Sequence, residues 1–369
     1  VGANSPIISL LVNLFVGIAL GANVVIAHAI GQGDKNTVKK AVHTSILVSL
    51  LGGVLVAALG ELAAAPLLRL LQVPDDVFPL ALLYLRIYLL GMPVILLYNF
   101  EAAIFRSVGE TKIPLLALAV SGVVNACLNL FFVIVCHMSV DGVATATVIS
   151  QYISLFLVVR CLCRSEGLSH LELKEIRLDK EESIRMIQIG FPAGLQSMLF
   201  SISNVLVQSS VNSFGASVVA ANTAASNIEG FIYTAMNSVF HAAITFTSQN
   251  LGAGKLSRTK RVYGSCIATS LMIGLPMCLV YFLFAPSLLS IYVSSADPSY
   301  QDVINYGLIR MRWLGCFQFL GGLMEDACGM VRGLGKSWLP MFVTGIGACL
   351  SRIIWIYTVF QAVHTPEIL

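Results

Sequence analysis

Long apolar stretches alternate with short polar connections along almost the whole chain. Each stretch has enough apolar length to cross a bilayer as a helix, which takes about 20 residues. The expected helical segments lie near residues 4–30, 41–71, 79–105, 113–136, 142–163, 186–212, 217–250, 262–292, 302–330 and 338–361. The pattern therefore predicts an all-α integral membrane protein with about ten transmembrane helices.

Two of the polar connections occur twice. Residues 30–42 (IGQGDKNTVKKAV) resemble residues 251–263 (LGAGKLSRTKRVY), and residues 105–114 (FRSVGETKIP) resemble residues 331–340 (VRGLGKSWLP). The paired segments keep their order and nearly their separation, which indicates that the two halves of the chain are homologous. In a chain this apolar, internal duplication is typical of transporters whose binding site lies between two related helical bundles.

Basic residues are concentrated in alternate connections. The connections between them contain no Lys or Arg and lie near residues 72–78, 137–141, 213–216 and 293–301. Under the positive-inside rule, the basic connections face the cytoplasm. Neighbouring segments are thus expected to cross the membrane in opposite directions.

A polar stretch at residues 164–185 separates the two halves and carries charges of both signs. We interpret it as a cytoplasmic linker, a solvated tether along the membrane surface. The predicted domains are an N-terminal bundle at residues 1–163, this linker, and a C-terminal bundle at residues 186–369. Val1 opens directly into an apolar segment, so equal repeats would need one more span before it and one after Leu369. Two six-helix bundles with the same orientation are then expected.

The composition excludes a water-soluble globular protein. Hydrophobic residues make up 57% of the chain and charged residues 11%, against roughly 45–50% and about 25% in soluble domains. The nine cysteines lie in or beside apolar stretches, which favours small core residues. The C-x-C pair Cys161 and Cys163 has no partner cluster and is a weak metal signal. Neither half contains the phosphate-binding pattern G-x-x-x-x-G-K-[ST], and we expect no metal or cofactor.

Glycine-rich motifs with basic residues lie in the repeated connections, and further motifs lie inside apolar segments. They are H-A-I-G-Q-G-D (His28–Asp34), R-S-V-G-E-T-K-x-P (Arg106–Pro114), V-x-N-x-x-L-N (Val123–Asn129), G-F-P-A-G (Gly190–Gly194), Q-N-L-G-A-G-K (Gln249–Lys255) and R-G-L-G-K-S-x-x-P (Arg332–Pro340). In this order and spacing, they resemble the multidrug and toxic compound extrusion (MATE) family over essentially the whole chain. The resemblance implies the MATE fold of two six-helix bundles, with the visible segments corresponding to its second to eleventh helices.

The resemblance also implies a function. It indicates a multi-pass protein of the inner, cytoplasmic membrane that exports amphipathic or cationic small molecules by alternating access. The export would be secondary antiport coupled to protons or sodium. The expected partners are the small-molecule substrate and the lipid bilayer, with no nucleic acid, and the protein is expected to act as a monomer.

Two other functions have to be weighed for a chain that crosses the membrane several times. A lipid-linked oligosaccharide flippase of the same superfamily would share the architecture but would need a more cationic cavity for a pyrophosphate. Arg352, in the last segment, keeps this alternative open, whereas an acidic residue near the midplane argues against it. A membrane enzyme is not indicated, because no paired nucleophile and base, metal cluster or catalytic loop is visible.

Acidic side chains inside membrane segments are costly and therefore functional candidates. The candidates for cation or proton coupling are Glu101, Glu229, Glu325 and Asp326. Glu229 is the clearest, because it lies near the middle of its segment with no basic neighbour within one turn. Structural ion pairs with Arg106 and Arg332 are the alternatives for Glu101 and Asp326. Many MATE members have an acidic residue in their seventh helix, but segment 186–212 contains none.

Polar and adaptable side chains could line a central cavity. Asn204 and Gln208 are one turn apart and face the same side of their helix. Gln196, Phe200 and Met236 complete the candidate lining, since amides, rings and thioethers suit varied amphipathic substrates. The alternative is structural: amides hold helices together, and aromatic and methionine side chains pack in cores.

Overall fold

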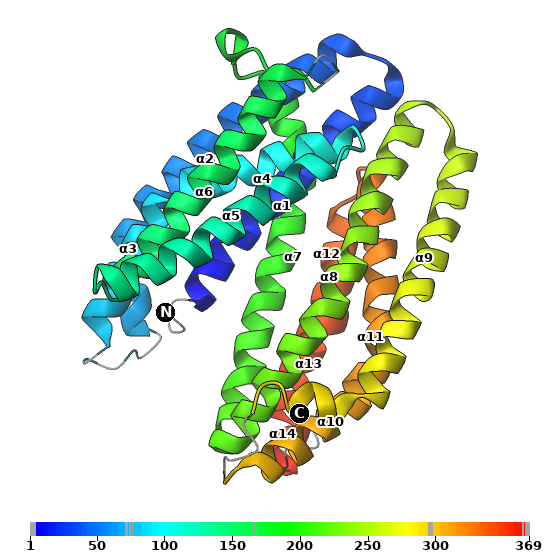
Figure 1. Cartoon of the computed structure of the whole chain (residues 1–369). Helices are drawn as coiled ribbons and strands as arrows, with labels where there is room; N and C mark the ends of the chain where they lie inside the picture. Colours follow the sequence, from blue (N-terminus) through cyan, green and yellow to red (C-terminus); the bar gives the residue numbers. More distant parts are fainter. Residues whose placement is uncertain are drawn as a thin grey trace. The chain divides into compact units, whose positions relative to one another are not determined.

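The computed structural model describes residues 5–70, 77–165, 169–293 and 298–363, together with residues 73, 75, 167 and 365. This part of the chain is built from helices and contains no strand (Figure 1). Every one of the expected apolar segments is helical over most of its described residues. The chain is therefore an all-α membrane protein, as its apolar pattern predicts.

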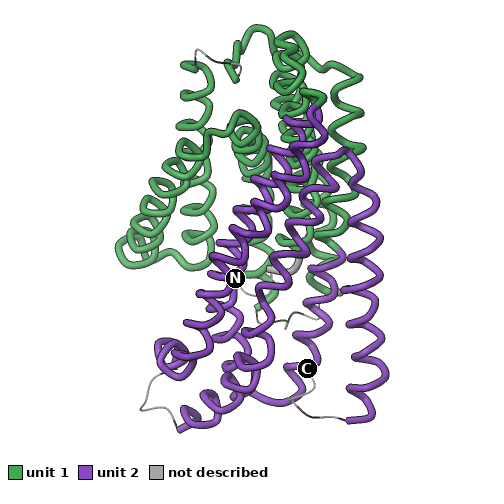
Figure 2. The backbone as a smooth tube through the Cα atoms, turned by 90° about the vertical axis from the view of Figure 1, so that its right-hand side faces the viewer, with its two compact units in different colours: residues 1–198, 252–254 green, residues 199–251, 255–369 purple. Residues whose placement is uncertain are grey.

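Two compact units make up the structure, drawn in green and purple in Figure 2. Unit 1 contains residues 1–198 and 252–254, and unit 2 contains residues 199–251 and 255–369. The boundary falls inside the long helix α7 (Lys180–Asn212), which contributes to both units.

Unit 1 begins with six helices that precede α7. They are α1 (Ser5–Gln32), α2 (Lys35–Leu70), α3 (Phe78–Leu90), α4 (Met92–Ser107), α5 (Lys112–Leu130) and α6 (Val140–Arg164). A π-helical turn at Phe131–Val135 extends α5, and a 3-10 turn at Leu173–Glu175 precedes α7. The segment expected at 79–105 is two helices, because α3 and α4 bend by 47° at Gly91. Pro93 opens α4, where its missing N–H costs no helical hydrogen bond.

Unit 2 follows the end of α7 with a second series of helices. They are α8 (Ala216–Gly252), α9 (Leu256–Leu283), α10 (Ala285–Leu289), α11 (Tyr300–Gly333), α12 (Trp338–Thr344), α13 (Ser351–Tyr357) and α14 (Val359–Ala362). A π-helical stretch, Gly345–Leu350, connects α12 to α13. Phe284 separates α9 from α10, so the segment expected at 262–292 is also divided.

The turns after the repeated helices have the same backbone conformation in both halves. Gly33 (φ 75°) and Gly254 (φ 70°) are in the left-handed region after α1 and α8. Gly109 (φ 84°) and Gly335 (φ 81°) repeat this conformation after α4 and α11. Glycine adopts it without the steric penalty of a side chain, which explains why these residues recur in the sequence.

Seven helices of the described residues are long and apolar enough to cross a membrane, or eight if the bent pair α3 and α4 is one span. The expected count of about ten also includes α8 and α11, which have 37 and 34 residues. Their length is sufficient, since a helix rises about 1.5 Å per residue. They fall short in apolarity because α11 carries several charged residues, including Arg310, and α8 carries Glu229 together with many Asn, Ser and Thr residues.

Glycines bring α1 and α7 into close contact inside unit 1. A Cβ added to Gly17 would lie 2.1 Å from the backbone nitrogen of Gly194, and one added to Gly190 would lie 2.4 Å from the Cα of Ile18. Gly21 meets the carbonyl of Met186 in the same way, at 2.1 Å. Small residues one turn apart on both helices permit this approach, as is common between membrane helices.

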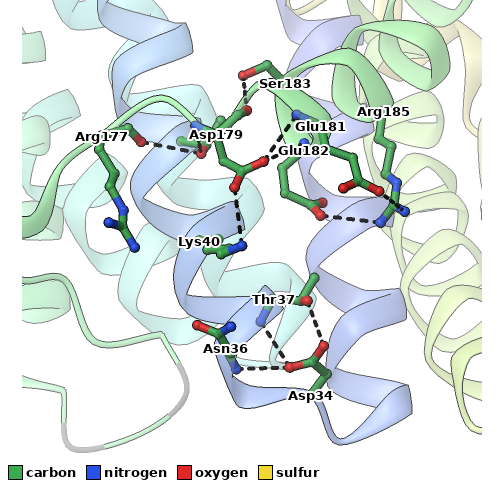
Figure 3. Close-up of polar contacts among 11 residues, drawn as sticks. Asp34, Asn36, Thr37, Lys40, Arg177, Asp179, Glu181, Glu182, Ser183 and Arg185 are labelled. Carbon is green, nitrogen blue, oxygen red and sulfur yellow. Dashed lines mark hydrogen bonds and ion pairs between the residues drawn. The ribbon is translucent and has the colours of Figure 1, made fainter.

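The linker between the halves is bound to α2 (Figure 3). Asp179 pairs with Lys40 at 3.4 Å, and Lys39 pairs with Glu172 at 3.0 Å and Glu175 at 2.7 Å. The ring nitrogen Nε2 of His43 accepts a hydrogen bond from the backbone N–H of Glu172 at 3.1 Å. This part of the linker thus lies against α2, where its carboxylates complement the lysines and the paired side chains stay partly exposed to solvent.

Candidate polar site on α8, α9 and α11

A charged pair within unit 2 joins α8 to α11. The guanidinium of Arg310 donates from Nη2 to Glu229 Oε2 at 2.7 Å and from Nε to Oε1 at 3.1 Å. Only 11% of the Glu229 side chain and 24% of the Arg310 side chain are exposed. This two-point geometry fixes both orientation and distance, and it is stronger than a contact through one atom.

Tyr281 of α9 completes the surroundings of the Glu229 carboxylate. Its hydroxyl donates a hydrogen bond to Oε1 at 3.1 Å. The ring is almost fully buried and lies against Gly315 of α11, where an added Cβ would be 2.1 Å from the ring. The absence of a side chain at Gly315 thus makes room for the ring that carries this hydroxyl.

Amide side chains extend the site from Arg310 to the end of α7. Arg310 Nη1 donates to Asn222 Oδ1, and the Asn222 amide donates to Gln208 Oε1 at 3.0 Å. Gln208 in turn donates to Asn212 at 2.9 Å. Asn222 and Glu229 can share Arg310 because they are seven residues apart, two turns along one face of α8. The charged pair and these amides form one continuous network, which we call the Glu229 network.

The network surrounds the Glu229 carboxylate with hydrogen-bond donors and one positive charge. Its carboxylate accepts three hydrogen bonds and is neutralised by a cation of the protein itself. A proton or metal cation can occupy this carboxylate only in competition with Arg310. The arrangement is therefore suited to an exchange of cations, in which arrival of one releases the other.

Asp326 lies on α11 without the ion pair considered from the sequence. It is fully buried, and its Oδ2 accepts a hydrogen bond from the Ser270 hydroxyl of α9 at 2.6 Å. Among the described residues, its Oδ1 has no hydrogen-bond partner. The Arg332 guanidinium lies 5.4 Å from the centre of the Phe240 ring, as in a cation–π contact. Glu325, next to Asp326, is half-buried and lies within the electrostatic reach of Arg332.

Glu101 belongs to unit 1 and also lacks its suggested partner. It is fully buried on α4, and neither of its carboxylate oxygens has a hydrogen-bond partner in the described part of the chain. No ion pair forms between Glu101 and Arg106, both of which the structure describes. An ionised carboxylate without a partner is costly at such a position, so Glu101 is a candidate for a group that carries a proton.

The candidate lining residues are distributed over both units. Asn204 accepts a hydrogen bond from Arg352 of α13 at 3.1 Å, and both side chains are exposed. Gln208 belongs to the Glu229 network, whereas Gln196 is buried on the part of α7 that lies in unit 1. Phe200 is partly buried, and Met236 lies in the core of unit 2 against Gly274 and Gly322.

Sequence reasoning missed Arg310 and Tyr281 as partners of Glu229, and Asn222 as a partner of Arg310. Glu229 has no basic neighbour within one turn of its own helix, but Arg310 reaches it from another helix, 81 residues later. The sequence did contain a signal for Arg310, because an arginine inside an apolar segment is itself a functional candidate. Tyr281 and Asn222 carried no comparable signal, since single tyrosines and asparagines are common in such helices.

Comparison with known proteins agrees with this architecture. The MatE family model matches residues 1–131 and 192–358, one range in each half. The probable multidrug resistance protein YoeA of Bacillus subtilis is 27% identical over 303 residues, which are 80% of this chain and 65% of YoeA. The chain thus spans less than two thirds of the length of YoeA. The probable multidrug resistance protein NorM of Thermotoga maritima is 22% identical over 359 residues, 96% of this chain and 76% of that protein.

A solved structure has the same fold over the whole chain. A crystal structure of MATE in complex with MaL6 has a TM-score of 0.92 and 22% sequence identity, and the match covers 100% of this chain and 82% of that one. At this identity the likeness shows the fold alone. The family itself is shown by the match to the family model, which covers most of both halves. The chain belongs to the MatE family of membrane transporters, as the sequence motifs predicted.

Proposed function

We propose that the protein is an ion-coupled secondary antiporter that exports amphipathic or cationic small molecules. The observation that carries the proposal is the buried pair of Glu229 and Arg310, which ties α8 to α11 within unit 2. The relatives named as multidrug resistance proteins support the export of small molecules. The coupling ion is a proton or sodium, and the protein acts as a monomer in the inner, cytoplasmic membrane.

The exchange begins at the Glu229 carboxylate. When a proton binds one of its oxygens, or a sodium ion binds both, the carboxylate no longer attracts the Arg310 guanidinium. The contact between α8 and α11 weakens, and an alternative arrangement of these helices gains population. A ligand shifts such an equilibrium only by its difference in affinity for the two arrangements, and the competition with Arg310 supplies that difference.

A cationic substrate enters the same competition. If it neutralises Glu229, the coupling ion cannot bind at the same time, so one cation leaves as the other arrives. This mutual exclusion is the requirement for antiport. Glu101, Glu325 and Asp326 are further candidates for carrying protons, since Glu101 and Asp326 are buried carboxyls with unpartnered oxygens among the described residues.

A lipid-linked oligosaccharide flippase receives less support. Its pyrophosphate would need cations that are not already neutralised, but Arg310 is held by Glu229. Arg352 donates to the neutral Asn204 and still suits this alternative.

Dye export by cells that express the protein tests the proposal. We expect Glu229→Gln to abolish export of a cationic dye such as ethidium, because the neutral amide cannot exchange cations. Glu61→Gln is a matched control, since Glu61 also pairs with an arginine, Arg86, but in unit 1 at 3.4 Å. Export should stop when the proton or the sodium gradient is collapsed, and the gradient that matters identifies the ion.

Two outcomes would contradict the proposal. Undiminished export by Glu229→Gln would remove this residue from coupling. Export that continues when both gradients are collapsed would exclude secondary antiport. Expression level and elution as a single species from a sizing column separate loss of function from loss of folding.

A further inference from the structure

A groove of about 710 Å³ runs along unit 2 between the second half of α8 and the first half of α9. Arg258 and Arg261 line one end, and Phe246, Val262 and Ile273 line its apolar wall. Ile273 lies fifteen residues beyond Arg258, which corresponds to roughly 22 Å along the helix. This length is about that of a headgroup and one leaflet of a bilayer that is roughly 40–45 Å thick in total.

The internal duplication provides a second copy of this connection, in unit 1, for comparison. In the aligned repeats, Lys39 and Lys40 of α2 correspond to Lys260 and Arg261 of α9. In unit 1, the carboxylates of the linker neutralise both lysines: Glu172 and Glu175 contact Lys39, and Asp179 contacts Lys40.

In unit 2, the arginines of the repeated connection have no carboxylate partners among the described residues. Neither Arg258 nor Arg261 forms an ion pair with any described residue, and the lining of the groove contains no Asp or Glu. A second groove, in unit 1, also has two arginines, Arg160 and Arg164, but its lining includes Glu110. The groove between α8 and α9 therefore has an uncompensated positive end.

We propose that this groove binds an anionic phospholipid of the leaflet that the basic connections face. The lipid phosphate lies between Arg258 and Arg261, where Arg261 has the position that Lys40, the partner of Asp179, has in unit 1. An acyl chain then lies along Phe246, Val262 and Ile273. Basic pockets between membrane helices on the cytoplasmic side are suited to anionic headgroups.

Polar side chains deeper in the groove do not contradict this occupant. The Ser265 and Thr269 side chains also line the groove. The Thr269 hydroxyl donates to the backbone carbonyl of Ser265 at 2.9 Å, so its hydrogen-bonding requirement is met within α9. The wall beside the acyl chain is thus less polar than its composition suggests.

Native mass spectrometry of the purified protein with defined lipids tests the inference. We expect wild type to retain one phosphatidylglycerol more tightly than phosphatidylethanolamine of the same chains. Arg258→Gln/Arg261→Gln should bind phosphatidylglycerol about thirtyfold more weakly, from the typical contribution of two basic residues near a lipid surface. Both side chains are exposed and unpaired, so the variant should keep the thermal stability of wild type.

Lys255→Gln/Lys260→Gln is the matched control. It removes the same charge from the same connection, but neither lysine lines the groove. We expect this control variant to change the affinity for phosphatidylglycerol less than threefold. An equal loss in both double variants would overturn the inference, because it would show attraction by overall charge. Equal binding of the two lipids by wild type would also overturn it, as would displacement of phosphatidylglycerol by millimolar inorganic phosphate.

Discussion

Glu229 of α8 and Arg310 of α11 form a two-point ion pair within unit 2, although 81 residues separate them in the chain. The pair lies inside two long helices that are less apolar than the candidate membrane spans of the described residues. Charged groups at such positions are costly unless they are paired. Their presence indicates a requirement other than stability, and cation exchange is the function that we propose for it.

Removing one partner of this pair should destabilise the protein more than removing both. Arg310→Gln leaves the Glu229 carboxylate buried without its cation, which costs about 3 kcal/mol at a partly exposed site. Glu229→Gln/Arg310→Gln should recover most of this loss, because two neutral amides can hydrogen-bond to each other. Thermal unfolding in detergent measures the difference. A double variant less stable than Arg310→Gln would contradict the expectation.

The Tyr281 hydroxyl should contribute to stability and to the ion dependence of export. Tyr281→Phe removes one hydrogen bond to a charged acceptor, which typically costs about 1.5–3 kcal/mol. We also expect the pH or sodium dependence of dye export to shift, because Glu229 loses a donor while keeping Arg310. Tyr263→Phe on the same helix is the control. An unchanged ion dependence would show that Tyr281 has a packing role only.

The glycine contact between α1 and α7 should tolerate no side chain. Gly194→Ala places a methyl group 2.2 Å from the carbonyl oxygen of Leu14, so the helices must separate. Overpacking of this kind costs about 1–3 kcal/mol. Gly122→Ala on α5 is the control, because nothing lies within 4 Å of an added Cβ there. Equal thermal stability of the two variants would argue against a close crossing of α1 and α7.

Asp179 should hold the start of α7 in a pH-dependent way. Its carboxylate accepts hydrogen bonds from the backbone N–H groups of Glu181 and Glu182, and these bonds, together with Lys40, lower the pKa of Asp179 below its ordinary 3.8. A carboxyl whose pKa is lower in the folded than in the unfolded state stabilises the fold at pH values above its unfolded-state pKa. This stabilisation is lost as the pH falls through the folded-state pKa. We therefore expect the first turn of α7 to be held at pH 7 and released below pH 3.8.

Hydrogen exchange of peptides from the linker measures this effect. Asp179→Asn keeps an N-cap oxygen but loses the charge, so its exchange should be faster than wild type at pH 7 and equal to it in acid, after correction for intrinsic rates. Asp34→Asn at the start of α2 is a comparison, because Asp34 caps Asn36 and Thr37 in the same way but has no part in the linker. A difference between Asp179→Asn and wild type that persists at low pH would contradict the electrostatic explanation.

Apolar length and duplication in the sequence alone determined the fold class and the helical segments, and the motifs of the repeated connections carried the resemblance to the family. These features are local or repetitive: spans follow from runs of apolar residues, and turns follow from glycines such as Gly33 and Gly254, whose conformation the structure repeats. The sequence also identified Glu229 as an unusual residue and Gln208 as a polar candidate. Neither inference needed knowledge of which helices are neighbours.

Only the tertiary structure decided what these residues contact. Arg310 reaches Glu229 from α11, Tyr281 reaches it from α9, and Asn222 links the pair to Gln208. The linker carboxylates likewise find Lys39 and Lys40 of α2, which sequence spacing did not suggest. Ion pairs and hydrogen bonds act over a few ångströms between atoms. Helix packing brings such atoms together from distant parts of the chain, and no pattern within a single helix records that.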